Sequence, residues 1–261
     1  MDIYIILERV RAEKPLVHHL TNWVTIYDCA NIVKALGASP VMAHAKEESG
    51  DMAAIASSLV LNIGTLTPEF VESMKIAAKS ANKKGIPVVL DVCGAGATKL
   101  RDEKSFELLD EAGINIIKGN ASEIARIAGE KVRTKGVDSV EVGKDLIELA
   151  GRLAEKRNAT VVITGKEDIV AGKAKHFIVK NGHEMMSHVV GTGCMAASVI
   201  GTFSAVHKDL AEAAAAALSV YGIAAELAAK ESKGPATFKE KLFDNIYRLD
   251  KETIDRMKNI E

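Results

Sequence analysis

Short β-branched runs alternate with amphipathic helical segments through the middle of this chain, and this alternation limits its possible folds most strongly. The strand-like runs are 59–63, 87–91, 114–118 and 160–164. The helical segments between and around them are 68–84, 105–112, 121–128 and 142–156. Parallel strands joined by helical crossovers give this order. We therefore predict an α/β fold, with a mostly parallel sheet covered by helices on both faces, in one domain that spans residues 1–261.

The last third of the chain differs from the middle, because a predicted hairpin is followed by almost continuous helix. Strands with polar ends are predicted at 168–171 and 175–180, with Gly172-Lys173 as the turn. The predicted helices that follow cover 194–206, 210–230 and 238–258. The apolar stretch 211–229 carries two glutamates, so we interpret it as a packed helix rather than a membrane span.

Composition is that of an ordinary soluble globular protein and excludes several classes of partner. Of the 261 residues, 48% are apolar and 26% are charged, and the formal net charge is -1 with a pI near 6.7. The chain thus lacks the basic field that binds nucleic acid or an anionic membrane, and it has few aromatic side chains for base stacking. We expect neither nucleic acid nor a membrane as a partner.

The three cysteines, Cys29, Cys93 and Cys194, are far apart and match no zinc-binding spacing. Their odd number does not favour a disulfide framework, and charges appear too early in the sequence for a secretory leader. We therefore expect a cytoplasmic protein.

Polar side chains stand at or near the carboxyl ends of four predicted strands. They are Asn62, Asp91, Lys118 and Thr164. In open α/β sheets, ligands bind outside the carboxyl ends of the strands. The sequence therefore predicts the functional site at this edge of the sheet.

Residues 190–194 (VGTGC) stand directly before a predicted helix and form a candidate anion site. Glycines let the backbone approach a ligand closely, and the first amides of a helix attract phosphate or a developing oxyanion. The alternative is a simple glycine turn with Cys194 as a small core residue. The spacing fits neither a phosphate-binding P-loop nor the dinucleotide fingerprint.

Two further stretches allow both a functional and a purely structural interpretation. Asp91 and the glycine-rich loop after it suit a metal-bound water or a nucleotide phosphate, but also a strand cap and turn. In 118–123 (KGNASE), Glu123 faces either the waters of Mg²⁺ or the first turn of a helix that Asn120 or Ser122 caps.

Candidate contacts for a small ligand lie in the first part of the chain. His18 and His19 are adjacent on a predicted strand and point in different directions, so they make a poor metal pair. Asn22 suits either a polar contact with a ligand or a hydrogen-bonded strand end. Met42 suits a soft wall for a heteroaromatic ring.

In chain order, seven stretches together strongly resemble the hydroxyethylthiazole kinase family of the ribokinase-like superfamily. They are TN at 21–22, GASPVMAHAKEE at 37–48, LNIGTL at 61–66, VVLDVCGAGAT at 88–98, IIKGNASEI at 116–124, ITG at 163–165 and GTGC at 191–194. The resemblance implies a ribokinase-like three-layer α/β/α sandwich with a mostly parallel central sheet. It also implies a homotrimer with the active sites at subunit interfaces.

The resemblance further implies ATP-dependent phosphorylation of the hydroxyl of 4-methyl-5-(2-hydroxyethyl)thiazole, with Mg²⁺, in thiamine salvage. By this resemblance, Asn22 and Met42 line the thiazole site, and Gly191 closes over it. Lys118 and Thr164 would contact ATP.

The resemblance also implies roles at the reacting phosphoryl group. Glu123 and Asp91 would organise Mg²⁺ and its waters. The amides of Thr192, Gly193 and Cys194 would face the transferring phosphoryl group, because phosphoryl transfer needs mainly positioning and charge stabilisation. Related sugar kinases carry an aspartate base at the position of Cys194. We expect this thiol to position the acceptor and to assist proton removal only weakly.

The chain departs from the family pattern at three places. Val92-Cys93-Gly94 stands where Pro-Val-Gly is usual, and His18-His19 stands where His-Cys is common. Lys118 occupies a position that is more often arginine, which keeps the charge but not the bidentate geometry. These differences concern the choice of substrate more than the class of reaction.

Four other functions stay open on sequence alone. A kinase for a hydroxymethylpyrimidine, pyridoxal or a sugar shares the fold, although an aspartate in place of Cys194 would favour it. A nucleotide-dependent dehydratase of hydrated nicotinamide cofactor shares the fold but not the reaction. A non-catalytic binder would sense thiazole or nucleotide without turnover. A thiol hydrolase built on Cys194 is the least favoured, because no histidine is an evident partner in the sequence.

Overall fold

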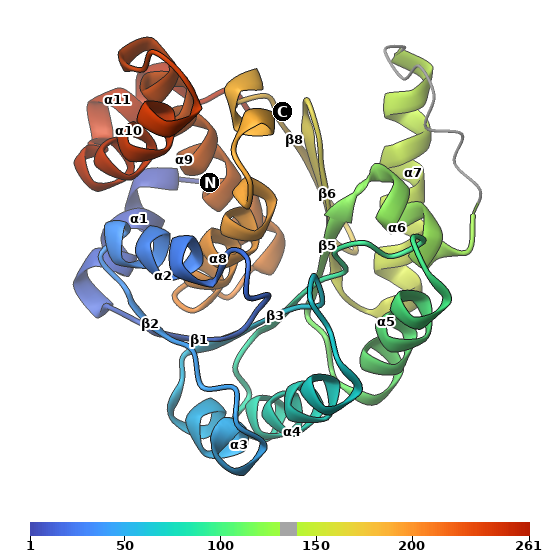
Figure 1. Ribbon diagram of the computed structural model, residues 1–261. Coiled ribbons are helices and arrows are strands. Elements are labelled where there is room, and N and C mark those ends of the chain that lie inside the picture. Colours follow the sequence, from blue (N-terminus) through green and yellow to red (C-terminus); the bar gives the residue numbers. More distant parts are fainter. Residues whose placement is uncertain (131–139) are drawn as a thin grey trace.

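The computed structural model describes residues 1–130 and 140–261, and its centre is one eight-stranded sheet (Figure 1). The strands follow the order β2-β1-β3-β4-β5-β6-β7-β8 across the sheet. The first six pair in parallel, whereas β7 and β8 form an antiparallel edge, so the predicted mostly parallel sheet is confirmed. The bounds are β1 Leu16–Leu20, β2 Ser39–Val41, β3 Ser58–Asn62, β4 Val88–Asp91, β5 Ile116–Asn120, β6 Thr160–Thr164, β7 Asp168–Ala171 and β8 His176–Val179.

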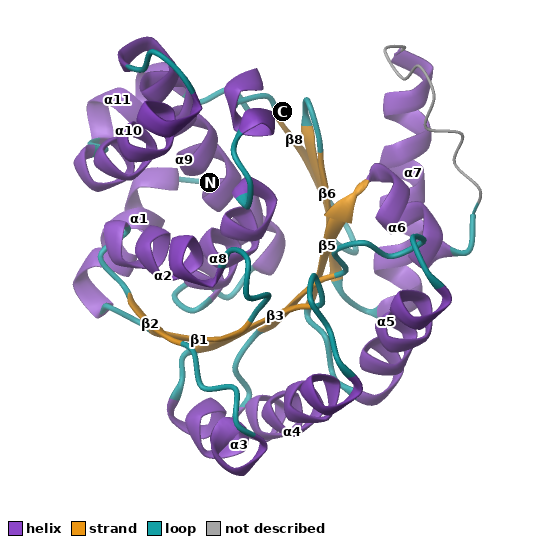
Figure 2. Ribbon diagram, in the orientation of Figure 1, coloured by secondary structure: helices purple, strands orange, loops and turns teal. Residues whose placement is uncertain are grey.

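Helices cover both faces of the sheet and complete three layers (Figure 2). On one side lie α1 Ile3–Glu13, α2 Ile26–Ala35, α8 Thr192–Ser204, α9 Leu210–Glu231, α10 Pro235–Arg248 and α11 Lys251–Met257. On the other side lie α3 Lys46–Ile55, α4 Pro68–Lys84, α5 Lys99–Glu111, α6 Ala121–Ala128 and α7 Val140–Arg157. The chain is thus a three-layer α/β/α sandwich, as expected.

Residues of the central strands divide between two apolar cores, one on each face of the sheet. Val60 and Val89 belong to the core that contains α8 and α9, whereas Leu59, Leu61 and Leu90 belong to the core that contains α4. A strand buried on both faces needs apolar side chains at consecutive positions. This requirement explains the unbroken apolar runs in the sequence.

Local capping signals set the ends of α4 as the sequence predicts. The Thr67 side chain accepts a hydrogen bond from the amide of Phe70, and Pro68 occupies the first turn. Gly85 ends the helix in the left-handed region, at φ 79°. The start of α4 limits how far β3 extends, and the end of α4 limits where β4 begins. The two caps therefore help to determine which side chains reach the edge of the sheet.

Two helix predictions need correction. The single helix predicted at 238–258 is wrong, because Asp250 accepts a hydrogen bond from the amide of Thr253 and starts α11 after a break. Aspartate favours such caps over helix interiors. The helix predicted from residue 105 begins earlier, directly after its N-cap Thr98.

Helix α9 is long and apolar enough to cross a membrane, and it is the one such helix in the described ranges. However, 78% of the relevant window is buried inside the protein. It packs against α8 and α10 in the core. The interpretation of this stretch as a packed helix is therefore confirmed.

Candidate functional site

Six residues stand at or near the carboxyl ends of neighbouring strands and form one row along that edge of the sheet. In strand order from β2 to β6, they are Met42, Asn22, Asn62, Asp91, Lys118 and Thr164. The first turn of α8 reaches the same edge, because Cys194 contacts both asparagines of this row. The fold thus brings the predicted residues to one edge.

Asn22 is held in one orientation by the turn that follows it. Its Oδ1 accepts hydrogen bonds from the backbone N and the Oγ1 of Thr25, both at 3.1 Å. Its Nδ2 therefore points the other way and donates to Asn62 Oδ1 at 3.0 Å and to Cys194 Sγ at 3.3 Å. An amide fixed at its acceptor end presents only donors to the site.

Asn62 continues the same chain of hydrogen bonds. Its Oδ1 accepts from Asn22 and from the amide of Gly64, at 2.9 Å for the latter. Its Nδ2 donates to Asp91 Oδ2 at 2.8 Å and to Cys194 Sγ at 3.4 Å. Two amide donors thus converge on one sulfur. The sequence places Asn62 at a strand end, but it does not single the residue out from an ordinary strand cap.

The start of α8 has the features of an anion site. The first amides of a helix have no acceptor within the helix, and the N-cap Gly191 has no side chain to supply one. Gly191 has a φ of 94°, and a Cβ there would lie 2.6 Å from Thr25 Cγ2. Lys118 Nζ lies 3.3 Å from where a Cβ of Gly193 would stand. Helix amides and an ammonium group therefore face the same place.

Lys118 and Asp91 form a buried ion pair in the middle of the row. Nζ lies 3.3 Å from each carboxylate oxygen, and both side chains are almost fully buried. Burial raises the pKa of Asp91, although Lys118 opposes this effect. Burial lowers the pKa of Lys118, but the negative charges of Asp91, Glu123 and Cys194 outweigh burial and leave that pKa above its usual value. Lys118 is therefore charged at neutral pH.

Cys194 is the acidic member of a pair of thiols. A hydrogen bond with Cys93 lowers the pKa of Cys194 to about 5, against the effect of burial and with help from Thr25, Lys118 and Asn22. The same hydrogen bond, with burial, raises the pKa of Cys93 well above its ordinary value. Cys194 is half-buried at the site, so its interpretation as a core residue is wrong.

Glu123 ties the loop after β4 to the start of α6. Its Oε1 accepts from the amide of Gly94 and its Oε2 from the amide of Asn120, both at 2.7 Å. Asn120 Oδ1 in turn accepts from the amide of Glu123 at 3.0 Å, so the predicted helix cap is confirmed. Each carboxylate oxygen of Glu123 keeps a further lone pair for another donor.

The described residues contain no group of three or more His, Cys, Asp or Glu arranged to hold a metal ion. A cage made only of protein ligands is thus absent from that part of the chain. Magnesium usually keeps several waters and binds through one or two carboxylates together with substrate phosphates. Asp91 and Glu123 fit this second mode, because Glu123 has unused lone pairs and both carboxylates stand at the same edge.

The predicted residues at the two ends of the row stand at the correct edge of the sheet. Thr164 Oγ1 donates to the carbonyl of Gly119 at 3.4 Å. Met42 is half-buried directly after the edge strand β2. Near it, His18 Nε2 lies 2.9 Å from the carbonyl oxygen of Ala43, whereas His19 Nε2 lies 3.1 Å from Ser198 Oγ. The two histidines thus make separate contacts, as predicted.

Arg101 was not predicted, yet it holds two loops of the site together. Its Nη1 donates to the carbonyl oxygens of Ile63 and Cys93, both at 2.9 Å, and its Nη2 donates to Gly64 at 2.7 Å. These carbonyls belong to the loops after β3 and β4. No sequence pattern reveals this role, because it depends on how α5 packs beside the loops.

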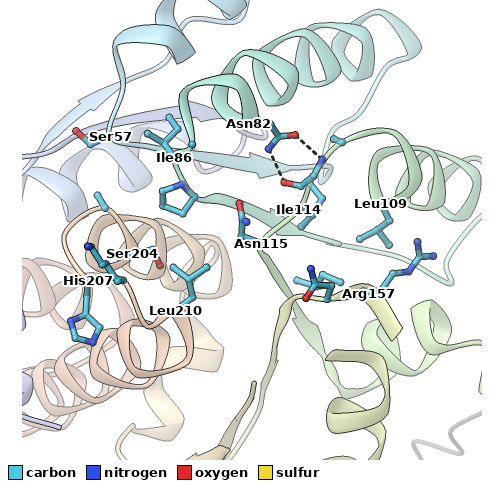
Figure 3. A pocket seen from close by; sticks show the side chains of 18 of the residues that line it. Ser57, Asn82, Ile86, Leu109, Ile114, Asn115, Arg157, Ser204, His207 and Leu210 are labelled. Atoms are coloured by element: carbon cyan, nitrogen blue, oxygen red, sulfur yellow. Dashed lines mark hydrogen bonds between the residues drawn. The ribbon is translucent and has the colours of Figure 1, made fainter. Parts of the chain in front are cut away.

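A large cavity lies away from these groups, at the amino edge of the sheet (Figure 3). Its volume is about 930 Å³, and Ser57, Asn115, Arg157 and His207 are among its lining residues. A pocket of about 490 Å³ opens instead beside Glu123, between the 94–97 loop and the start of α6. We assign the functional site to the carboxyl edge, because the ion pair, the acidic thiol and the helix amides gather there.

Known proteins resemble this chain over almost its full length. The model of the hydroxyethylthiazole kinase family matches residues 7–252. The hydroxyethylthiazole kinase of Methanosarcina mazei is 54% identical over 255 residues, which are 98% of each chain. The structure of a hydroxyethylthiazole kinase protein from Pyrococcus horikoshii has a TM-score of 0.92 at 42% identity, covering 99% of this chain and 98% of that one. A ribokinase-like superfamily protein from Enterococcus faecalis shares the fold, with a TM-score of 0.65 at 16% identity over 93% of both chains.

Proposed function

The chain belongs to the hydroxyethylthiazole kinase family, and from this premise we propose which of its residues carry the reaction. The enzyme phosphorylates hydroxyethylthiazole in thiamine salvage, with ATP as co-substrate. In our proposal, the transfer takes place between Cys194 and the Asp91–Lys118 pair. The observation that carries it is the convergence of the Asn22 and Asn62 amides on the Cys194 sulfur, beside the open first turn of α8.

The protein's main contribution is a fixed field around the transferring phosphoryl group. The amides of Thr192, Gly193 and Cys194 would hold its oxygens, and Lys118 would supply a full positive charge. Lys118 is held by both carboxylate oxygens of Asp91, and groups fixed in this way need little reorganisation during the reaction. Lys118 is buried, and its charge therefore acts through a less polar medium than water.

Cys194 would orient the acceptor hydroxyl toward the phosphoryl group. Its sulfur accepts hydrogen bonds from two fixed amides and can accept another from the substrate hydroxyl. A thiolate whose pKa is about 5 is a weak base at neutral pH, so its help in proton removal is small. Asn22, Met42 and Gly191 would surround the thiazole ring, with the Met42 thioether against the heteroaromatic face.

Lys118 and Thr164 would contact ATP, and the pocket beside Glu123 would give room for part of the nucleotide. Asp91 and Glu123 would hold Mg²⁺ through its waters. When bound, the ion would neutralise charge on the phosphates. The free lone pairs of Glu123 at this edge support its part in holding the ion.

A homotrimer would complete this site by covering its open side. Several large apolar side chains that are close in sequence to Asn22 or Gly191 are exposed. They are Trp23, Val24, Tyr27 and Val190, with exposed fractions of 57%, 68%, 76% and 72%. Apolar surface that gathers beside a functional site is typical of an interface. We further propose a cytoplasmic location, because all three cysteines are free thiols and a reducing compartment preserves them.

The direct test is ATP consumption with Mg²⁺, measured with and without 4-methyl-5-(2-hydroxyethyl)thiazole, followed by mass analysis of the product. We expect thiazole-dependent consumption and a product that has gained one phosphoryl group. Omission of Mg²⁺ is expected to abolish the signal. Turnover with a pyrimidine or pyridoxal alcohol but not with the thiazole would support phosphoryl transfer as the reaction and refute the thiazole alcohol as its acceptor.

A further inference from the structure

His18 is a fully buried histidine in β1 that the proposed function does not yet use. Its Nε2 lies 2.9 Å from the carbonyl oxygen of Ala43. A carbonyl oxygen only accepts hydrogen bonds, so Nε2 carries the proton and donates. Nδ1 is buried as well and has no hydrogen-bond partner in the described chain. Burial lowers the pKa of His18, so the ring is neutral and its one proton lies on Nε2.

An unpaired ring nitrogen makes histidine a costly choice for this position. A buried acceptor without a donor lowers the stability of the fold, and an apolar side chain of similar size has no such group. The one contact that an apolar side chain cannot make is the hydrogen bond to Ala43. We therefore look for the use of His18 in the segment that this bond holds.

That segment, residues 42–44, lies between the end of β2 at Val41 and the start of α3 at Lys46. Among the described residues, no backbone amide donates to the Ala43 carbonyl. His18 is the register partner of Val41 in the pairing of β1 with β2, so its ring reaches just past the end of the edge strand. The ring supplies a hydrogen bond where the backbone pairing of the two strands has ended.

The same segment is held a second time, through the side chain of His44. The centroid of its ring lies 4.6 Å from that of Trp23 and 5.3 Å from that of Phe70. Aromatic rings at such distances pack favourably. Because Trp23 directly follows Asn22, this packing joins the segment that carries Met42 to the segment that carries Asn22.

We propose that His18 is a positioning residue for the acceptor: its Nε2–H holds the Ala43 carbonyl and so keeps Met42 in place against the thiazole ring. The effect on acceptor binding rests on the proposed function, whereas the hold on residues 42–44 does not. The hydrogen bond of the His18 ring goes to Ala43 and not to a reacting group. Its loss is therefore expected to weaken binding of the acceptor and to leave phosphoryl transfer and ATP binding in place.

The first experiment compares the steady-state kinetics of His18→Leu and His18→Gln with those of the wild type. Leucine removes the donor, whereas the longer glutamine side chain can place an amide nitrogen near the position of Nε2. In His18→Leu we expect the KM for the thiazole alcohol to rise about tenfold, as for one lost hydrogen bond, with kcat and the KM for ATP within about twofold of the wild type. His18→Gln is expected to recover most of the affinity. His176→Gln, on the exposed end of β8, is the control.

A second measurement does not depend on kinase activity, because Trp23 is the only tryptophan of the chain. Its ring lies against that of His44, so a displacement of residues 42–44 changes its surroundings. We expect His18→Leu to shift the emission maximum of Trp23 and to increase its quenching by acrylamide. His18→Gln and His176→Gln are expected to keep the wild-type emission. If His18→Leu does not fold, His18→Asn replaces it, because the shorter amide stays polar but ends nearer the β1 backbone.

The outcomes separate this role from a general structural one. An unchanged KM for the thiazole alcohol in His18→Leu, with unchanged Trp23 emission, would overturn the proposal. Equal rises in this KM in the leucine and glutamine variants would also overturn it, because the donor would then be irrelevant. A joint loss of kcat and of both substrate affinities would show a general structural role instead. Altered Trp23 emission in an enzyme that phosphorylates no thiazole alcohol would support the hold on residues 42–44 and refute only the proposed acceptor.

Discussion

At the scale of single residues, variants of Cys194 test whether this site needs a general base or only a group that orients the acceptor hydroxyl. Its sulfur is held by two amides, and its pKa of about 5 makes it a weak base at neutral pH. We expect Cys194→Ala to keep turnover within about tenfold of the wild type, since an essential general base contributes about 10²–10⁴. Cys194→Asp is expected to raise turnover, because a carboxylate oxygen accepts the hydrogen bond of the substrate hydroxyl more strongly than sulfur does and so orients it better.

These variants are compared by steady-state kinetics with saturating ATP, so that kcat and the KM for the thiazole alcohol are obtained separately. Cys194→Ser serves as the matched control, because it keeps a small polar side chain. A purely orienting thiol predicts a larger effect on KM than on kcat. Complete loss of activity in both the alanine and the serine variant would contradict this role.

His19 makes the stability of the fold depend on pH. It is fully buried in β1, and burial lowers its pKa to about 3 from an ordinary value near 6.5. Between these two values the unfolded chain binds more protons than the folded one. The contribution of neutral His19 to the free energy of unfolding is therefore complete above pH 6.5 and is lost as the pH falls toward 3. We expect the free energy of unfolding to be about 2 kcal/mol lower at pH 5 than at pH 7 from this residue.

Urea unfolding of the wild type and of His19→Gln at the two pH values measures this difference. The glutamine variant is expected to be less stable at pH 7 but to depend less on pH, because it no longer titrates. The control is His176→Gln, since His176 is exposed on β8. If His19→Gln retained the full pH dependence of the wild type, another group would have to be its source.

At the scale of elements, α8 connects the core to the site, and one glycine sets its distance from the sheet. A Cβ at Gly201 would lie 2.4 Å from Val60 Cγ2 in the central strand β3. We expect Gly201→Ala to lower the free energy of unfolding by about 1–3 kcal/mol through overpacking. Because the same helix carries residues 192–194, a shift of α8 is also expected to raise the KM for both substrates.

The matched control is Gly151→Ala in α7, where an added Cβ would meet nothing within 4 Å. Alanine has the higher helix propensity, so this variant is expected to gain up to about 1 kcal/mol. Chemical unfolding of the two variants beside the wild type tests the contrast. Equal stability of Gly201→Ala and Gly151→Ala would refute close packing of α8 on the sheet.

The elements themselves were largely predictable, because their signals are local. Apolar runs mark the strands, since both faces of β3 and β4 are buried, and Thr67 and Gly85 mark the ends of α4. The break at Asp250 was missed because its capping role competes with a helical pattern on both sides. Only the structure shows that the chain turns before Asp250 and that this aspartate caps a new helix.

The site was predictable only in part, because contacts between distant segments leave little trace in sequence. Asp91, Lys118 and Thr164 could be placed, since each stands at or near a strand end and parallel strands bring such ends to one edge. The contacts of Asn22 and Asn62 with Cys194 depend on how closely α8 approaches the sheet. Only the fold fixes that approach.

At the scale of the whole molecule, the carboxyl edge of the sheet carries both the reactive groups and an exposed apolar patch. The patch consists of Trp23, Val24, Tyr27 and Val190. Trp23 also stacks on Phe70, with ring centroids 5.9 Å apart, so one member of the patch is held in place by the core. A held apolar surface next to a substrate site has the character of an interface, which is why we propose that a partner subunit completes the site.

Tyr27→Glu tests this assembly, because a carboxylate in an apolar interface loses its hydration without gaining a partner. We expect the wild type to have the mass of a trimer by light scattering and the variant to have the mass of a monomer. The KM for the thiazole alcohol is expected to rise by at least about tenfold in the variant, since loss of interface anchors leaves the site open. The control is Tyr247→Glu, because Tyr247 is equally exposed, at 73%, but lies on α10. A Tyr27→Glu monomer with unchanged KM would show that each subunit binds the thiazole alone, whereas a monomeric wild type would refute the trimer itself.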